Sequence, residues 1–274
     1  GITGKIDAPR WAPGIISNLL GILRFKHISA SSKLRIIYGL TRIKFIKRIA
    51  REQLDRESFE SWLRRHHQND ETITRFWNLI VLPALNDNIT EVSADSGIML
   101  FQTALLGKPH RTAIGLPTLG LSKLAGESAK HYIESQGGVV ITGTNISEIV
   151  IENDIVKGIF TSDRKFIPTN KLIIALTSNE LLSILPKTYQ NHKFFQPAKK
   201  LTTSPIVGVH IWYDRQIMSE QFLAILDSPL QWIFNITKIH KYEDTFKENG
   251  QHIAISLSGA WHWKDLPKTE IRRI

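Results

Sequence analysis

Residues 137–177 read GGVVITGTNISEIVIENDIVKGIFTSDRKFIPTNKLIIALT, and this stretch decides the fold. The segments 146–151 and 155–161 flank the polar pair Asn153 and Asp154, which predicts two strands joined by a turn. Residues 165–167 predict a brief third strand, and residues 139–142 a short strand before the meander. The continuous apolar run 171–177 is typical of a strand buried on both faces.

The segment before this stretch predicts a helix over residues 122–136. Leu124, Ala125, Ala129, Tyr132 and Ile133 recur at helical spacing and are expected to point inward. Gly137 supplies the left-handed position that ends such a helix. The predicted order is therefore helix, strand, three-stranded meander and buried strand.

The region before residue 107 is predicted to be mostly helical. Ser31 and Ser32 offer caps for a helix over 33–51, and Ser58 begins the next helix. Two further helices are expected over 71–85 and 93–106. Apolar residues at spacings of three and four, from Ile36 to Ala50, support the helix over 33–51.

The last hundred residues are predicted to form a short helix and then an antiparallel sheet. The helix covers 179–185, and the strands cover 206–213, 222–226, 231–236 and 252–257. The fold class is therefore α/β, or mixed α+β. We divide it into a helical part at 1–119, a part of a cofactor domain at 120–178, and a sheet part at 179–274.

Charge is concentrated near the start of the chain. The net charge is +10 overall, and residues 1–65 carry +9 of it. A local basic block usually meets an anionic surface, which is nucleic acid or lipid headgroups. The basic residues alternate with Ile, Leu and Phe rather than exposed aromatics, which disfavours nucleic acid.

Two interpretations of the basic helix therefore stay open. It lies on a membrane surface, with Arg42, Lys44, Lys47 and Arg48 on the headgroups, or it packs on its own domain as an ordinary amphipathic helix. No apolar run is long enough to span a bilayer, and no signal peptide is visible. The chain has no cysteine, which excludes disulfides and thiolate metal sites and fits a reducing compartment.

Common catalytic and metal motifs are missing from the sequence. No Gly-x-Gly-x-x-Gly, His-Glu-x-x-His or Gly-x-Ser-x-Gly occurs, and the glycine-rich loop at 115–122 has Leu121 where a phosphate-binding lysine belongs. His66 and His67 are adjacent, so they point apart on a helix. We expect no metal site. His210 lines a cavity or lies in a core, and we favour the core.

Several stretches together resemble one family of enzymes. They are PRW at 9–11, SFESWLRRH at 58–66, RFWNLIVLPALN at 75–86, the stretch 137–177 and QWIF at 231–234. This order is similar to the squalene-associated flavoenzymes, the hydroxysqualene dehydroxylases of hopanoid synthesis. That family is a branch of the phytoene desaturase and flavin amine oxidase superfamily.

The resemblance implies FAD as the cofactor, held by a doubly wound domain of which residues 120–178 would be a part. It places Ile146 near the adenine and Ala175, Leu176 and Thr177 at a strand end near the flavin. The family's prolines after this strand are replaced by Thr177 and Ser178. The start at Gly1 and the uncapped end at 269–274 lead us to expect a fragment that lacks the phosphate-binding segments and binds flavin weakly by itself.

The resemblance also implies a long isoprenoid lipid as substrate, and such a substrate needs an apolar tunnel. Our candidates for its lining are Phe76, Trp77, Asn86, Trp212, Trp232 and Phe234. Plain core packing is the alternative for each aromatic ring. No acid for the departing hydroxyl can be assigned.

The implied reaction is reductive removal of the hydroxyl of hydroxysqualene to give squalene. The implied location is the cytoplasmic face of a bacterial membrane, as a peripheral protein. Two other functions remain open. One is a carotenoid-type desaturase of the same superfamily, and the other is a non-catalytic protein that binds lipid or membrane.

Overall fold

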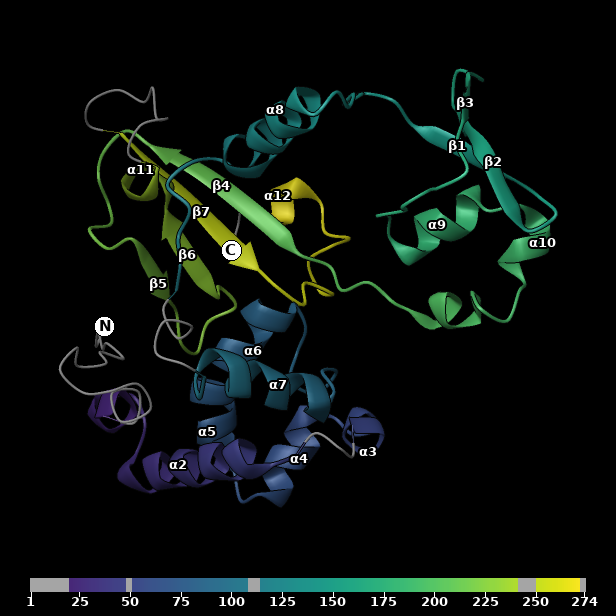
Figure 1. Ribbon diagram of the computed structural model, residues 1–274. Helices are drawn as coiled ribbons and strands as arrows, with labels where there is room; N and C mark the ends of the chain where they lie inside the picture. The colour runs from purple at the N-terminus through teal and green to yellow at the C-terminus, as the bar shows by residue number, and fades with distance from the viewer. Residues whose placement is uncertain (1–19, 48–50, 108–113, 241–249, 272–274) are drawn as a thin grey trace. The chain divides into compact units, whose positions relative to one another are not determined.

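The chain combines helices with two antiparallel sheets, as Figure 1 shows for the computed structural model. The structure describes residues 20–47, 51–107, 114–240 and 250–271. Two compact units are present. The first comprises residues 1–120 and 204–274, and the second comprises residues 121–203. The second unit thus includes residues 179–203 with the meander.

The first unit begins with a set of helices that carry the apolar residues expected from the sequence. They are α2 (Ala30–Phe45), α3 (Arg51–Asp55), α4 (Phe59–Arg65), α5 (Asp70–Thr72), a π-helical turn (Ile73–Trp77), α6 (Asn78–Leu85) and α7 (Ala94–Ala104). The cap of α2 is Ser29, whose side chain accepts from the Ser32 amide, so the predicted caps are two or three residues late. This helix also ends at Phe45 rather than at residue 51.

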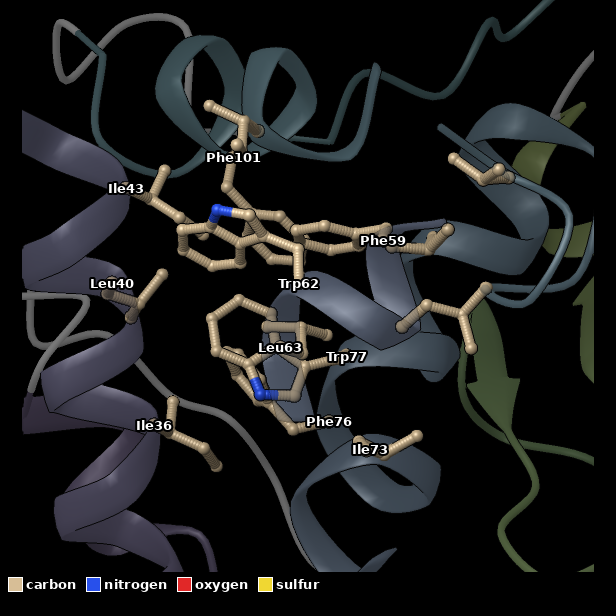
Figure 2. Packing of buried hydrophobic residues seen from close by; sticks show 14 of the residues in the cluster. Ile36, Leu40, Ile43, Phe59, Trp62, Leu63, Ile73, Phe76, Trp77 and Phe101 are labelled. Atoms are coloured by element: carbon tan, nitrogen blue, oxygen red, sulfur yellow. The ribbon is translucent and has the colours of Figure 1, made fainter. Parts of the chain in front are cut away.

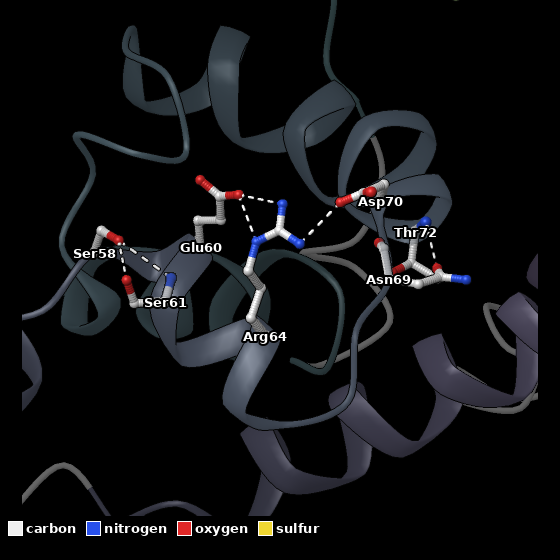
Figure 3. Close-up of polar contacts among 7 residues, drawn as sticks. All are labelled: Ser58, Glu60, Ser61, Arg64, Asn69, Asp70 and Thr72. Atoms are coloured by element: carbon white, nitrogen blue, oxygen red, sulfur yellow. Dashed lines mark hydrogen bonds and ion pairs between the residues drawn. The ribbon is translucent and has the colours of Figure 1, made fainter.

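Local polar chemistry fixes the ends of these helices. The hydroxyl of Ser58 accepts from the Ser61 amide at 3.2 Å, which satisfies one of the donors left unpaired at the start of α4. Figure 3 shows Arg64 between two carboxylates, and its guanidinium donates to Glu60 at 2.7 Å and to Asp70 at 2.8 Å. These bonds raise the pKa of Arg64 and join α4 to the start of α5.

The core of the first unit is built from aromatic rings of these helices (Figure 2). Trp77 packs edge-on against Phe59 and Phe101, at ring-centroid distances of 6.0 and 4.8 Å. Its indole N–H donates to the side-chain oxygen of Gln68 at 2.9 Å, so no polar atom of the ring is stranded. Ile36, Leu40 and Ile43 of α2 close one side of this cluster (Figure 2).

The remainder of the first unit is a four-stranded antiparallel sheet. Its strands are β4 (Val207–Tyr213), β5 (Phe222–Ala224), β6 (Trp232–Asn235) and β7 (Gln251–Leu257), in the spatial order β4-β7-β6-β5. Short helices α11 (Ile236–Ile239) and α12 (Lys268–Ile271) accompany it. All four predicted strands are confirmed, with ends shifted by at most two residues.

The second unit contains the predicted meander of β1 (Ile146–Glu152), β2 (Ile155–Thr161) and β3 (Phe166–Pro168). Asn153 and Asp154 both have positive φ, which is the turn that a two-residue hairpin favours. The other elements are a π-helical turn (Ser122–Glu127), α8 (Ser128–Ser135), α9 (Ser178–Ile184), α10 (Lys187–Gln190) and a 3-10 helix (Gln196–Lys200). Gly137 has φ +80°, as expected after the helix.

Two predicted strands of the second unit are not formed. Residues 139–142 and 171–177 have no strand pairing, and Ile173 is 96% exposed although burial on both faces was expected. The inward face predicted for 122–136 is wrong as well, because Leu124, Tyr132 and Ile133 are exposed. An apolar run is typical of buried segments, but its composition does not supply a strand to pair with. No described strand adjoins 171–177.

Candidate functional site

One face of the four-stranded sheet gathers aromatic and histidine side chains. Strand alternation and the registers place on this face, which we call the aromatic face, the following residues: Gly208, His210, Trp212, Phe222, Ala224, Trp232, Phe234, His252, Ala254 and Ser256. The opposite face carries Ile253 and Leu257, which are buried. The two faces therefore differ in role, since one packs inward and the other presents rings.

The rings of the aromatic face form two groups in contact, one of His210, Trp212 and His252 and one of Phe222, Trp232 and Phe234. Trp212 stacks on His252 at a centroid distance of 4.4 Å and an angle of 13°. Phe222 lies 5.8 Å from Trp232 and 6.3 Å from Phe234. Trp212 is 53% exposed, and the rings of His252, Phe222, Trp232 and Phe234 are half-buried. Flat apolar rings with exposed surface suit an extended hydrocarbon ligand.

Three of the six predicted substrate residues lie on this face. Trp212, Trp232 and Phe234 come from β4 and β6, and β7 lies between these strands. The indole N–H of Trp232 donates to the carbonyl of Leu79 in α6 at 3.3 Å, which fixes the ring where the sheet meets the helices. Sequence reasoning missed Phe222, although its place in a predicted strand offered the signal.

Phe76 and Trp77 lie elsewhere, in the helical core. Phe76 is 2% exposed and Trp77 is 0% exposed, and their rings contact each other at 5.1 Å. A ring without accessible surface has nothing to offer a ligand in this arrangement. The position of both residues favours the core-packing interpretation over a role in a tunnel wall.

Asn86 joins the helices to the sheet. It ends α6 with a left-handed backbone at φ 60°, and its carbonyl accepts from the Gly259 amide at 3.1 Å and from the hydroxyl of Ser204. Its side-chain oxygen is 3.2 Å from the hydroxyl of Ser258. Asn86 therefore organises the loops at the ends of β4 and β7.

His210 is exposed, so the prediction that it lies in a core is wrong. Its Nδ1 lies 2.9 Å from Nε2 of His252, which is a hydrogen bond between two imidazoles. The register pairs His210 with Ala254 and Trp212 with His252, so the two histidines are diagonal neighbours. Sequence alone did not reveal this pair because it depends on that register.

The four residues assigned to the flavin lie in the second unit. Ile146 begins β1, Ala175 and Leu176 lie in an irregular exposed segment, and Thr177 caps α9 together with Glu180. The Thr177 hydroxyl and amide hold the Glu180 carboxylate, which lowers the pKa of Glu180. These bonds stabilise the first turn of α9, so Thr177 has a structural role as its N-cap.

The fit of a flavin dinucleotide to these residues is poor. The expected strand 171–177 is irregular and exposed, and the sequence has no glycine-rich turn for the pyrophosphate. The described residues of the second unit therefore do not form a cofactor cradle by themselves. Within the described ranges, no three His, Asp or Glu side chains gather in a way that would hold a metal ion.

The predicted membrane residues lie on and after α2. Arg42 and Lys44 project from its exposed side, Lys47 follows it in an exposed position, and Arg48 falls outside the described residues. None of the described helices combines the length and the apolar composition needed to cross a bilayer.

Solved structures with a similar fold include oxidoreductases. Wild-type putrescine oxidase bound to putrescine matches with a TM-score of 0.65 at 14% identity, covering 89% of this chain and 56% of that chain. An oxidoreductase from Methanosarcina mazei matches with a TM-score of 0.61 at 14% identity, covering 90% of this chain and 54% of that chain. The fold is thus that of flavin-dependent amine oxidases and related oxidoreductases.

The family of flavin containing amine oxidoreductases matches residues 5–274, and the chain belongs to this family. Among curated relatives, 15-cis-phytoene desaturase of Capsicum annuum is 23% identical over 271 residues, covering 97% of this chain and 46% of the relative. The 15-cis-phytoene desaturase of Synechococcus elongatus is 24% identical over 194 residues, covering 67% of this chain and 40% of the relative. The chain therefore spans less than half the length of these two relatives.

Proposed function

We propose that the protein is an FAD-dependent oxidoreductase of long isoprenoid lipids and that this chain supplies its substrate-binding surface. The aromatic face carries this proposal, because three rings chosen from the sequence as substrate walls lie together on it. Membership of the flavin containing family supports the reaction class. The phytoene desaturases among the relatives support a long isoprenoid substrate.

The first candidate reaction is the reductive removal of the hydroxyl of hydroxysqualene to give squalene. The motifs at 58–66, 75–86 and 231–234 support it by resemblance. The second candidate is desaturation of a carotenoid precursor, which the named relatives support. The two reactions run in opposite redox directions, so one assay separates them.

The assay uses the complete enzyme with bound flavin. Hydroxysqualene and a flavin reductant are expected to give squalene, detected by gas chromatography. Phytoene and an electron acceptor serve as the second arm, and a desaturated product there with no squalene in the first arm would favour the desaturase. No product in either arm would favour a non-catalytic lipid-binding protein.

Flavin binding is expected to need more than the residues described here. The exposed segment 171–177 and the missing glycine-rich turn predict weak binding of FAD by this chain alone. Titration of the purified chain with FAD, followed by flavin fluorescence, measures this affinity. Tight binding of one FAD per chain would contradict the prediction.

We further propose that α2 lies on an anionic membrane surface, as in a peripheral protein on the cytoplasmic face of a bacterial membrane. Its outer side carries Leu34, Tyr38 and Phe45, at spacings that place them on one stripe opposite the buried Ile36 and Leu40. Leu34 is 67% exposed and Phe45 is 72% exposed.

Basic residues lie on both sides of this stripe. On a helical wheel, Arg35 and Arg42 fall on one side and Lys33 and Lys44 on the other. An apolar stripe between two rows of cations matches the boundary between acyl chains and anionic headgroups. A membrane location also brings the protein to a substrate that dissolves in the bilayer.

Co-sedimentation with phosphatidylglycerol-containing liposomes tests this surface. Reversal of the charges of Arg42, Lys44, Lys47 and Arg48 to Glu is expected to weaken binding by at least about tenfold, since each cation contributes about 1 kcal/mol. Four reversals at exposed Lys157, Arg164, Lys171 and Lys199 of the second unit are the matched control. Equal loss in both variants would contradict a specific role for α2.

A further inference from the structure

The histidine pair on the aromatic face has polar chemistry that an apolar wall does not need. His210 and His252 bond to each other at 2.9 Å, beside the stacked ring of Trp212. A surface that binds only hydrocarbon gains nothing from two polar rings, because their hydration is lost when the ligand covers them. The pair therefore indicates a ligand with a polar group.

The bond between the rings uses Nδ1 of His210 and leaves its Nε2 for another partner. In the described part of the chain, no hydrogen bond engages this nitrogen. If His210 Nδ1 accepts from His252, Nε2 of His210 carries the proton and is a donor. If Nδ1 donates, Nε2 is an acceptor. A hydroxyl group both donates and accepts, so it can bond to Nε2 in either tautomer.

Gly208 leaves room for such a hydroxyl. It precedes His210 by two residues on the same face of β4, and a Cβ built on it would lie 4.0 Å from His210 Nε2. The glycine therefore keeps a space about the size of a methyl group open beside this nitrogen. Its φ lies outside the positive range, so no backbone requirement accounts for a glycine here.

Apolar rings lie beside this polar position, on the side of β7 and β6. Phe234 lies across β7 from His210, since both pair with Ala254, and Trp232 and Phe222 continue the surface. A ligand with one hydroxyl and a long apolar chain matches this arrangement of one polar spot and several rings. The pattern fits an isoprenoid alcohol better than an isoprenoid hydrocarbon.

We propose that His210, supported by His252 and given room by Gly208, binds the hydroxyl of a long isoprenoid alcohol whose chain lies on the aromatic face. This site rests on the proposed function, and it separates the two candidate reactions. A dehydroxylase substrate has a hydroxyl to bind, whereas a hydrocarbon leaves the histidine nitrogen without a partner. His210 is then a residue that determines substrate specificity.

The test compares farnesol with farnesene, which share an isoprenoid chain and differ in the hydroxyl. Affinities for the full chain are measured by tryptophan fluorescence, with both probes at the same mole fraction in detergent micelles. Farnesol is expected to bind about 2- to 10-fold more tightly, which is the gain of one net hydrogen bond. The variants His210→Phe and Gly208→Val should lose this preference and keep farnesene binding.

His131→Phe, an exposed histidine of α8, is the control and should keep the wild-type preference. Circular dichroism confirms that each variant folds. Equal binding of the two probes by the wild type would overturn the hydroxyl site while leaving an isoprenoid surface in place. A preference that persists in His210→Phe would also overturn it. Failure of both probes to bind would contradict the isoprenoid function together with the site.

Discussion

The first unit contains two aromatic clusters that look alike in sequence and differ in burial. The helical cluster has five rings that are at most 2% exposed, namely Phe59, Trp62, Phe76, Trp77 and Phe101. The rings of the aromatic face are all partly accessible, and Trp212 is 53% exposed. Both clusters stack rings at similar centroid distances, so ring contact alone does not separate them.

This contrast indicates that the atoms packed around an aromatic ring, rather than its residue type, decide the role of the side chain. In the helical cluster, residues of α2, α4 and α7 pack around the rings (Figure 2). The side-chain oxygen of Gln68 accepts from the indole N–H of Trp77. On the sheet, β-alternation presents the rings on a face away from the buried Ile253 and Leu257. The first cluster holds the fold, and the second is available to a ligand.

Truncation of the buried cluster is expected to give the largest effect on stability. Trp77→Ala removes a fully buried ring and leaves the side-chain oxygen of Gln68 without its donor. We expect the free energy of unfolding to fall by about 3–5 kcal/mol, measured by urea denaturation followed by circular dichroism. A loss below about 1 kcal/mol would show that this cluster is not the structural core.

A smaller loss of stability is expected from overpacking the same cluster. A Cβ on Gly97 of α7 would lie 2.4 Å from the ring of Phe59, so Gly97→Ala forces the ring or the helix to move. We expect a loss of about 1–3 kcal/mol in thermal or urea unfolding.

The matched control for this change is Gly126→Ala. Gly126 is also helical, and a Cβ there meets nothing within 4 Å. Without a clash, the substitution should increase stability by about 0.5–1 kcal/mol, which is the usual helical advantage of Ala over Gly. Similar effects of both substitutions would contradict the tight packing of Phe59 against α7.

Acid is expected to weaken the contact between α2 and the rest of the helical cluster. The hydroxyls of Ser29 and Ser32 donate to the Glu71 carboxylate and lower the pKa of Glu71. The stability from this carboxylate is therefore present above the pKa of Glu in the unfolded chain, about 4.3, and is lost as the pH falls through the lower folded value. Glu71→Gln should flatten the fall in stability below about pH 4.5.

Urea midpoints at a series of pH values measure this effect, and Glu134→Gln provides the comparison. Among the described residues, the Glu134 carboxylate has one ion pair, with Lys130 at 3.9 Å on the surface of α8. Its replacement should leave the acid dependence of the first unit unchanged. An unchanged pH profile in Glu71→Gln would show that the serine contacts of Glu71 do not contribute to stability.

The smallest effect on stability is expected on the aromatic face. Trp212→Ala should change the free energy of unfolding by no more than about 0.5 kcal/mol, because much of its ring is already in water. The same variant should weaken the binding of both farnesol and farnesene, since it removes apolar contact area. A loss of several kcal/mol in stability with unchanged binding would reverse the roles assigned to the two clusters.

Local chemistry in the sequence was sufficient for many elements. The serines at 58 and 93 start helices, Gly137 ends one, and Asn153 with Asp154 forms the hairpin turn. The alternation in residues 206–213 also predicted β4. In each case the residues that decide the structure are neighbours along the chain, so their pattern is visible without a fold.

Features that depend on distant partners were not predictable in this way. The run 171–177 has the composition of a buried strand, but composition does not supply a neighbouring strand. The bond between His210 and His252 requires the register of β4 on β7, and the burial of Trp77 requires three other helices. Three of the six candidate substrate residues lie on one face of the sheet. The alternation that places each of them on a face is local and visible in the sequence. The order of the strands, which brings them together, is not local.

The π-helical turn at Ile73–Trp77 absorbs one extra residue in the helical segment that leads into α6. The amide of Asn78 bonds to the carbonyl of Ile73, five residues earlier, so this turn holds one more residue than an α-helical turn. Deleting the exposed Thr74 would bring this bond back to the α-helical pattern, so α6 should keep its rotation. Val81 would stay in the core, and the Leu79 carbonyl would still accept from Trp232. A deletion within α6 itself would instead rotate the residues on its two sides by about 100° relative to each other.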